Sequence, residues 1–337
     1  MTEGQENARD TVTFAGVDEA GLGPLLGPLC FGYSVFCAPR TRADLWKTLD
    51  ACVSGVVERD ETRFAVADSK LVFTRNPRGA RRLEKTALGF LALLDPGRHP
   101  LANGFALALE SPRELRACPD VLATHPWYAP LERALPRHND RGALELSIER
   151  LWRTLRSENV TLVDAGVRVI PEGLLNRSFA RTNNKSQSVW DELAPILRRM
   201  FERHAQGGLR LSVDRQGGRS HYRPLLAALF PEAGVRVLRE REALSAYVVE
   251  ERDGPRRMRI LFAEKGERHS FAIALGSCLA KYARETSMDA FNETFARLDP
   301  RLAPTAGYTT DGLRWLDDAQ AALDAAGITA QDLQRTR

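Results

Sequence analysis

The sequence predicts an α/β fold, a β-sheet flanked by helices. Short apolar runs bounded by proline, glycine or acidic residues alternate with longer segments in which apolar residues recur at helical spacing. The chain has 337 residues, of which 43% are hydrophobic and 27% charged, so it can bury a sizeable core and lacks the composition of a disordered chain. Its net charge of +4 is too small to establish an anionic partner.

The first half of the chain predicts strands alternating with amphipathic helices. An apolar run at residues 11–17 stops at two acidic residues, and a second run at residues 29–37 lies between two prolines; both are typical of short strands. Apolar periodicity predicts helices at residues 45–57, 79–94, 142–156 and 186–204, and a strand at residues 160–164.

The second half predicts a hairpin and a long helix. Two apolar runs flank Asp253-Gly254, a favourable turn pair for a hairpin. The expected elements are strands at residues 209–213, 235–238, 247–252 and 257–263, and helices at residues 270–298 and 317–326. The last helix should end at Gly327 and close the chain.

We expect a flexible N-terminus at residues 1–12 and a single domain at residues 13–337. A largely helical insertion is expected at about residues 95–158; the apolar residues of its clear helix, residues 142–156, suggest that it packs onto the main domain. No apolar run approaches the ~20 residues of a membrane span, and the polar start is not a secretory signal. Five cysteines without CxxC spacing indicate reduced thiols, so we predict a cytoplasmic protein.

Acidic residues stand where predicted strands end. Asp18 and Glu19 follow one apolar run, Asp214 follows another, and Glu267 comes after the predicted hairpin. A carboxylate at the end of a buried strand is costly unless it is paired or bound to a metal. Several converging carboxylates repel one another, and oxygen ligands favour magnesium or manganese. Any one of these acids alone could instead be a turn former or a helix cap.

The glycine loop at residues 21–27 does not predict a dinucleotide site. It departs from G-x-G-x-x-G, two prolines interrupt the expected helix start, and two acids stand where a pyrophosphate would approach.

Residues 16–29, GVDEAGLGPLLGPL, closely resemble the opening motif of prokaryotic ribonuclease HII, usually GVDEAGRGPLAGPV. Further segments match that family in its order, within residues 11–75 and 205–315. They are Asp68-Ser69-Lys70-Leu71 (usually DSKKL), Ser212-Val213-Asp214 (VDG), Lys265-Gly266-Glu267 (KGD), Ala280 to Glu285 (AKVTRD) and Gly307-Tyr308-Thr309-Thr310 (GYGT-like).

The sequence departs from the family pattern at three places. Leu22 replaces the arginine of GRG, Glu267 replaces an aspartate, and Gln216 interrupts the usual VDG turn. The predicted hairpin also makes the interval between Asp214 and Glu267 longer than the family's usual connection.

The resemblance implies a ribonuclease H-like fold, a central mixed sheet flanked by helices with a helical C-terminal portion. It implies an endonuclease that hydrolyses the RNA strand of RNA–DNA hybrids or RNA–DNA junctions, leaving 5′-phosphate and 3′-hydroxyl ends. Two Mg²⁺ or Mn²⁺ ions, about 3.5–4 Å apart, would serve the chemistry. Asp18 would bridge them, and Glu19, Asp214 and Glu267 would complete the ligands. No membrane or protein partner is expected, and the chain should be a monomer.

The resemblance also implies substrate-binding residues. The Gly21-Leu22-Gly23 loop and Tyr308 would test for the ribose 2′-hydroxyl, the group that distinguishes RNA from DNA. Ser69 and Lys70 would buttress the site or touch the nucleic-acid backbone. Lys281 and Arg284, three residues apart on one helical face, would be structural or face a phosphate.

Several alternatives stay open at this point. The chain could bind nucleic acid without cutting it, or cut another nucleic-acid structure. Asp164, at the end of another predicted strand, is a rival for the role of Asp214. Two histidines, His221 and His269, could carry protons, and Trp127-Tyr128 could stack on bases or form a satellite core.

Overall fold

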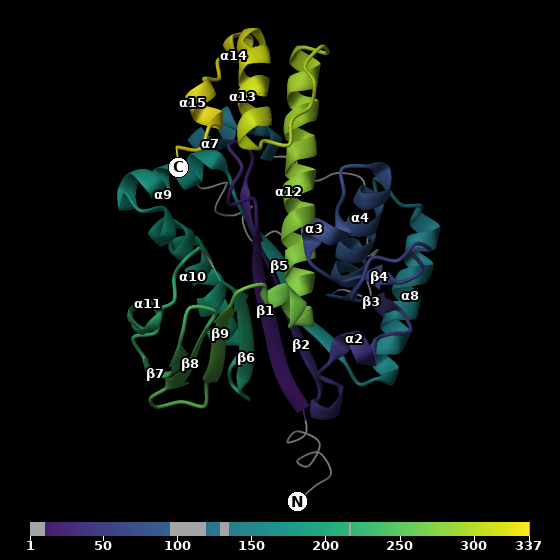
Figure 1. Ribbon diagram of the computed structural model, residues 1–337, viewed down its shortest axis with the longest axis vertical. Helices are drawn as coiled ribbons and strands as arrows, with labels where there is room; N and C mark the ends of the chain where they lie inside the picture. The colour runs from purple at the N-terminus through teal and green to yellow at the C-terminus, as the bar shows by residue number, and fades with distance from the viewer. Residues whose placement is uncertain (1–10, 95–118, 129–134, 216, 337) are drawn as a thin grey trace, which may run out of the picture.

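A seven-stranded mixed sheet forms the centre of the computed structural model, which describes residues 11–94, 119–128, 135–215 and 217–336 (Figure 1). The strand order is β5-β2-β1-β6-β9-β8-β7. β6 runs parallel to β1 and β9, and the other neighbouring strands are antiparallel. The seven strands are β1 (Thr11–Ala20), β2 (Leu29–Pro39), β5 (Thr161–Ile170), β6 (Leu209–Asp214), β7 (Ala233–Glu240), β8 (Leu244–Glu251) and β9 (Arg257–Ala263).

Helices cover both faces of this sheet and complete its two cores. One core lies under α4, α8 and α12, and the other under α9, α10 and α11. The helices are α2 (Leu45–Thr48), α3 (Ser69–Val72), α4 (Pro77–Leu91), α7 (Pro119–Thr124), α8 (Arg141–Ser157), α9 (Glu172–Thr182), α10 (Lys185–His204), α11 (Arg223–Leu229), α12 (Phe271–Leu298), α13 (Thr309–Asp318), α14 (Gln320–Ala326) and α15 (Ala330–Leu333). This mixed sheet with helical flanks and a helical C-terminal portion confirms the predicted fold class.

The 28-residue helix α12 packs directly on the backbone of β1 and β2. A Cβ atom on Gly32 would lie 2.1 Å from the carbonyl oxygen of Gly276 in α12, and one on Gly16 would lie 2.1 Å from the amide nitrogen of Ile273. Glycine is therefore required where helix and sheet approach this closely. As a result, α12 lies across the strand that carries Asp18 (Figure 1).

Most predicted elements are confirmed. The periodic segments at residues 79–94, 142–156, 186–204 and 270–298 form α4, α8, α10 and α12, with a short 3-10 turn extending α4. The predicted hairpin is β8–β9. The runs that end at acids are longer than expected, because Asp18, Glu19 and Asp214 lie inside their strands.

The predicted helix at residues 45–57 is wrong. Only Leu45–Thr48 is helical, and Val53–Ser54 forms the short strand β3, which pairs in parallel with β4 (Phe64–Ala65). Gly55 and three nearby valines disfavour helix continuation, since glycine lacks side-chain contacts and β-branched residues prefer extended backbone. Pairing with β4, whose residues lie eleven positions further along the chain than their partners in β3, decides the structure here.

The C-terminal portion is more helical than predicted. The expected closing helix at residues 317–326 is wrong at its start, since α13 begins at Thr309 and α14 begins at Gln320. Gly327 does end α14, in the left-handed conformation (φ 66°) that favours glycine. α15 then follows, so α14 does not close the chain.

The predicted insertion contributes to the main core. Residues 95–118 and 129–134 lie outside the described residues, but α7, a 3-10 turn at Pro126–Tyr128 and α8 are described. The four apolar residues of α8 that recur at helical spacing are buried in the core shared with α12, which confirms that this helix packs onto the main domain. Trp127 and Tyr128 are buried in the same core, so they are core residues and not a stacking surface.

The prediction of reduced thiols agrees with the four described cysteines. Cys30, Cys37, Cys52 and Cys278 are free thiols, and Cys118 lies outside the described residues. None of the described helices combines the length and apolarity that crossing a membrane requires. The predicted flexible N-terminus also lies outside them, except for Thr11 and Val12, which begin β1.

Candidate active site

Three parallel strands bring the acidic residues to one edge of the sheet. β6 lies between β1 and β9, with Val17 opposite Val213, so the next residues, Asp18 and Asp214, emerge side by side. Glu267 follows β9, on the 3-10 turn Gly266–Arg268 (η4). Ligands of open α/β sheets commonly bind at the carboxyl ends of parallel strands, so this edge is a candidate site.

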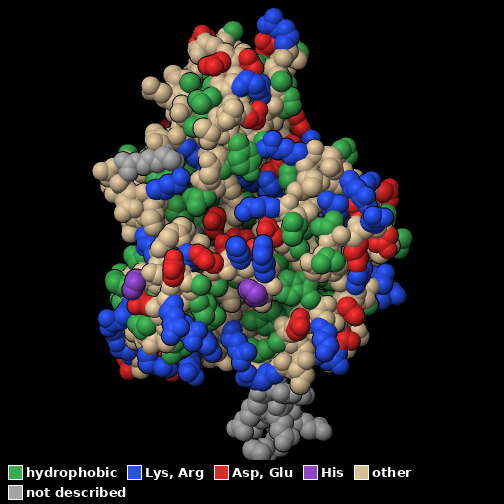
Figure 2. Space-filling model, in the orientation of Figure 1, with side chains coloured by type: hydrophobic (Ala, Val, Ile, Leu, Met, Phe, Trp, Pro, Cys, Tyr) green, Lys and Arg blue, Asp and Glu red, His purple; other side chains and the backbone are tan. Residues whose placement is uncertain are grey.

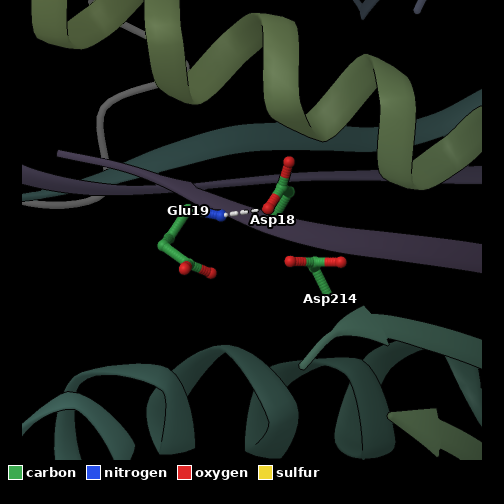
Figure 3. A group of neighbouring side chains, drawn as sticks. All are labelled: Asp18, Glu19 and Asp214. Carbon is green, nitrogen blue, oxygen red and sulfur yellow. Dashed lines mark hydrogen bonds between the residues drawn. The ribbon is translucent and has the colours of Figure 1, made fainter. Parts of the chain in front are cut away.

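The carboxylates of Asp18, Glu19 and Asp214 surround one small space, and one oxygen of each lies within 4.8 Å of the others (Figure 3). The backbone N–H of Glu19 donates to Asp18 over 2.8 Å, and that of Gly266 donates to Asp214 over 3.0 Å. One buried oxygen of Glu19 has no hydrogen-bond partner among the described residues. The protein thus compensates the negative charge of this cluster only in part.

The three carboxylates resist ionisation together. Burial raises the pKa of Asp18 from 3.8 to about 8, and the charge of Asp214 adds to the shift. Burial, followed by the charge of Asp18, raises the pKa of Glu19 well above its usual value. Burial also raises the pKa of Asp214 to about 6, with the charge of Glu267 contributing. A bound cation would offset these costs and keep all three ionised.

The donor set fits a divalent cation of the magnesium class. All donors are carboxylate oxygens, and one of them is buried without a partner, which is the situation that a hard cation satisfies. Glu267 is buried beside the cluster, and its charge raises the pKa of both Asp18 and Asp214. Its oxygens are not part of the group that meets within 4.8 Å.

The Asp68-Ser69-Lys70 segment lies against the acids. The positive charge of Lys70 lowers the pKa of both Glu19 and Asp214, and Lys70 itself is exposed. Ser69 is buried and accepts a hydrogen bond from the Ser277 hydroxyl over 3.0 Å, and a hydrogen bond with Ser277 also lowers the pKa of Asp18. Ser69 is therefore connected to Asp18 through Ser277 of α12, and Lys70 is exposed near the carboxylates.

The glycine loop follows Glu19 directly and has one crowded and one open glycine. Gly21 has a φ of 87°, and a Cβ there would lie 2.6 Å from the side chain of Arg284. A Cβ on Gly23 would meet nothing within 4 Å, so the exposed backbone at this position is open to a ligand. Leu22 is partly buried and packs against the core under α10, which explains why an apolar residue is accepted there.

The Gly307-Tyr308 segment docks on the glycine loop. The carbonyl oxygen of Gly307 accepts hydrogen bonds from the N–H groups of Leu25, over 2.7 Å, and Leu26, over 3.0 Å. Tyr308 is 47% exposed, and the guanidinium of Arg75 lies 5.2 Å from its ring centre. The tyrosine is thus held beside the loop with its ring open to solvent.

Arg284 holds these two segments together. It is 1% exposed and donates to the carbonyl oxygens of Leu26, over 3.3 Å, and Ala306, over 3.1 Å. This burial favours the structural role over contact with a phosphate. Lys281 donates to Glu285 over 2.5 Å and lies 4.7 Å from the ring centre of Phe73, so it is also engaged within the protein.

Two residues that support the loop carry no signal in the sequence. Glu172, fully buried at the start of α9, accepts from the N–H of Gly27 over 2.6 Å. Arg335, also buried, donates to the carbonyl oxygens of Gly21 and Gly27. Burial, together with the charge of Arg284, lowers the pKa of Arg335 to about 10. The feature that marks Arg335 as special is its burial, and burial is not visible in the sequence.

Among the described residues, none of the alternatives that the sequence left open belongs to the group formed by Asp18, Glu19 and Asp214. Asp164 is on β5, where its carboxylate pairs with His204 at 3.0 Å and Arg199 at 3.3 Å, so it is not the third acid of this cluster. The ring of His221 lies 3.9 Å from Glu240, at the end of β7. His269 follows η4 and is exposed next to Glu267 in the chain.

No family model matches this sequence, and no match is found among curated proteins. Solved structures do match: a chain of the PCNA:RNase HII complex from Archaeoglobus fulgidus has a TM-score of 0.42 and 13% identity over 97% of this chain and 95% of that one. Ribonuclease H2 from Pyrococcus horikoshii has a TM-score of 0.45 and 13% identity, with coverages of 96% and 92%. Bst-RNase HIII in complex with Mn²⁺ has a TM-score of 0.40 and 13% identity, with coverages of 96% and 66%.

Proposed function

We propose that this protein is a metal-dependent endonuclease, a ribonuclease H that hydrolyses the RNA strand of RNA–DNA hybrids or RNA–DNA junctions. The observation that carries the proposal is that segments far apart in the sequence meet at one place in the structure. Segments that resemble ribonuclease HII motifs are scattered along the chain, yet the acids of β1, Asp214 and the Asp68-Ser69-Lys70 segment meet at one edge of the sheet. The Gly307-Tyr308 segment docks on the loop beside them. If the resemblance had arisen by chance, these segments would not be expected to lie together in the structure.

Asp18, Glu19 and Asp214 would hold the metal, with Glu267 completing the set. Two bound Mg²⁺ or Mn²⁺ ions would activate a water and stabilise the leaving 3′-oxygen. The chain's own contribution is to hold the carboxylates in fixed positions through the Glu19 and Gly266 N–H groups. Hydrolysis forms a bond from the water oxygen to phosphorus and breaks the bond to the 3′-oxygen, which leaves a 5′-phosphate and a 3′-hydroxyl.

The loop residues would recognise the RNA strand. Gly23 has an open backbone and follows Glu19 closely in the chain, and the exposed Tyr308 belongs to the segment docked on the same loop, so the sugar preceding the scissile phosphate would lie beside these two residues. A 2′-hydroxyl both donates and accepts hydrogen bonds, so backbone groups of residues 21–23 can distinguish it from hydrogen. Lys70 would contact the phosphate, because its charge already faces the carboxylates that surround the reacting group.

The proposal is tested with three end-labelled 20-base-pair duplexes of one sequence: RNA–DNA, all-DNA, and DNA with a single embedded ribonucleotide. Each is incubated with Mg²⁺, with Mn²⁺ or with a chelator. We expect cleavage of the RNA–DNA hybrid with either metal, no cleavage of DNA, and no cleavage in the chelator. Binding without cleavage in every lane would favour the non-cleaving alternative, and cleavage of the all-DNA duplex would favour a nuclease with another target.

The matched controls use acids inside and outside the cluster. Asp18→Asn removes one charge from the site, and Glu285→Gln removes one from the neighbouring Lys281 pair on α12. Only the first should abolish cleavage. Equal losses for both variants would mean that the cluster is not the active site.

A further inference from the structure

The part of the sheet beyond the acidic cluster presents a row of arginines. Arg210 on β6 is opposite Arg259 on β9, which is opposite Val248 on β8, which in turn is opposite Arg236 on β7. All three arginine side chains are exposed. We call Arg210, Arg259 and Arg236 the arginine row.

The arginine row lies on the same face of the sheet as Asp214. Successive residues of a strand point to opposite faces, so Arg210 and Asp214, four residues apart on β6, share one face. The opposite face of β6 and β9 is the apolar one: Leu211, Ile260 and their neighbours pack in the core under α10. At about 3.3 Å per residue, the row lies roughly 13 Å from the acids along β6.

The surface around the row is hollowed and strongly basic. The row lines a hollow of about 350 Å³ together with Arg40 and Arg257, and none of the described residues that line it is acidic. Arg210 also lines a larger hollow of about 590 Å³, whose walls include Ser212, Arg268 and His269. The second hollow thus extends from the row toward Glu267. Figure 2 shows lysine and arginine side chains gathered on the lower part of this face, below the acidic side chains near its centre.

This arrangement is unfavourable for the isolated protein. Like charges directly opposite on neighbouring strands destabilise a sheet, and Arg210 and Arg259 form such a pair. No described carboxylate lies within 4 Å of the guanidinium groups of the row, whereas arginines elsewhere on the surface, such as Arg198 and Arg314, have acidic partners. An anionic ligand would compensate these charges.

We propose that the arginine row binds the phosphate backbone of a nucleic-acid duplex whose reacting strand lies in the acidic site. The choice of ligand rests on the proposed function. Strands are about 4.8 Å apart, so the row crosses roughly 14 Å from β6 to β7. The phosphates of one strand advance by about 3.4 Å of helix axis per nucleotide, so a row of this length covers about four nucleotides of a duplex whose axis lies along it, and its three arginines can contact up to three of the phosphates. Contacts of this kind position the duplex without reading its sequence.

The test measures binding apart from cleavage. Fluorescence anisotropy follows a labelled 20-base-pair RNA–DNA hybrid in chelator, across a series of salt concentrations. Arg210→Gln, Arg236→Gln and Arg259→Gln are combined in one variant. The matched control combines Arg141→Gln, Arg153→Gln and Arg156→Gln on α8, which lies on the other side of the molecule (Figure 1). Circular dichroism and the thermal midpoint establish that both variants are folded.

Each lost phosphate contact should lower the slope of log affinity against log salt by about 0.9, so the row variant should lose about 2 to 3 units of slope. Its affinity at 0.1 M salt should fall about tenfold or more, while the α8 control matches wild type. A variant with lysine at the three row positions should recover most of the slope, because lysine retains the charge.

Two results would overturn the proposal. The row variant could keep the wild-type salt slope for the hybrid, or the α8 control could lose as much slope as the row variant. Cleavage is measured separately, in single turnover at saturating enzyme. If the protein binds the hybrid through the row but never cuts it, the proposed function fails and this inference stands. If the protein cuts the hybrid but the row variant keeps the wild-type salt slope, the proposed function stands and this inference fails.

Discussion

The acidic cluster and the arginine row are two concentrations of like charge on one sheet face, about 13 Å apart, and they differ in burial. Asp18 is buried and Asp214 is partly buried, and burial is the main cause of the raised pKa of both carboxyl groups. The arginines of the row are exposed and keep their hydration. Both groups cost free energy in the isolated protein, but the costs have different sources.

This difference in burial indicates different ligands. A buried cluster of oxygen donors is compensated by a small, partly dehydrated cation that enters among the side chains. An exposed row of guanidinium groups is compensated by an extended polyanion that stays outside and is sensitive to salt. Substitutions in the cluster should therefore affect the chemical step, whereas substitutions in the row should affect binding.

The largest expected effect is that of Asp18→Asn, which should reduce single-turnover cleavage more than a thousandfold, about 4 kcal/mol. The reason is the loss of a metal ligand at the centre of the cluster. The folded protein resists ionisation of Asp18, and asparagine does not ionise, so the thermal midpoint in chelator should not fall. A variant that is inactive because it unfolds would contradict this interpretation.

Two substitutions of Glu267 distinguish the effect of its negative charge from the effect of its side-chain length. Glu267→Gln should reduce cleavage about a hundredfold, because it removes a carboxylate that acts on Asp18 and Asp214. Glu267→Asp keeps the charge and should be tolerated, with a changed preference between Mg²⁺ and Mn²⁺. Single-turnover rates of both variants are compared with Glu285→Gln. Damage by Gln at 285 but not at 267 would show that Glu285, and not Glu267, acts together with Asp18, Glu19 and Asp214.

Gly23→Ala tests the loop that adjoins the cluster. A Cβ at this position meets no protein atom within 4 Å, so the fold and the thermal midpoint should be unchanged. The methyl group would project where the RNA sugar approaches, so the affinity for the hybrid should fall about tenfold, about 1.4 kcal/mol. Gly21→Ala, by contrast, should lower the thermal midpoint, since its φ of 87° and its contact with Arg284 exclude a side chain. Equal effects of the two changes on the thermal midpoint would contradict the view that Gly21 is required by the fold and Gly23 is not.

The smallest expected effect is a pH dependence of stability. The folded protein holds protons on Asp18 up to a pKa of about 8 and on Asp214 up to about 6, whereas the unfolded chain releases them near 3.8. The folded state therefore binds more protons between about pH 4 and pH 8, and these groups make stability fall as pH rises through that range. The thermal midpoint in chelator, measured from pH 5 to 8, should decline less in Asp18→Asn than in wild type. Adding Mn²⁺ at pH 8 should raise the wild-type midpoint, and an equal gain in Asp18→Asn would contradict metal binding at the cluster.

The sequence alone was sufficient for most of the sheet strands, for the long helices and for the candidate acids. Helices such as α10 and α12 have apolar residues at helical spacing, and this periodicity is a local property. The positions of Asp18, Glu19 and Asp214 at the ends of apolar runs were likewise visible, because a strand of this kind needs only a few consecutive residues to be identified. The segment at residues 45–57 shows the limit, since its β3 strand depends on pairing with β4.

The tertiary structure decided which distant residues act on the site. Glu172 and Arg335 hold the glycine loop from positions about 145 and 308 residues away from Gly27, as their hydrogen bonds show. The arginine row exists only because β6, β9, β8 and β7 pair in one register, and a shift of one residue would turn each arginine to the opposite face. The register depends on the packing of the whole sheet, so the arginine row follows from the sequence but cannot be recognised in any local stretch of it.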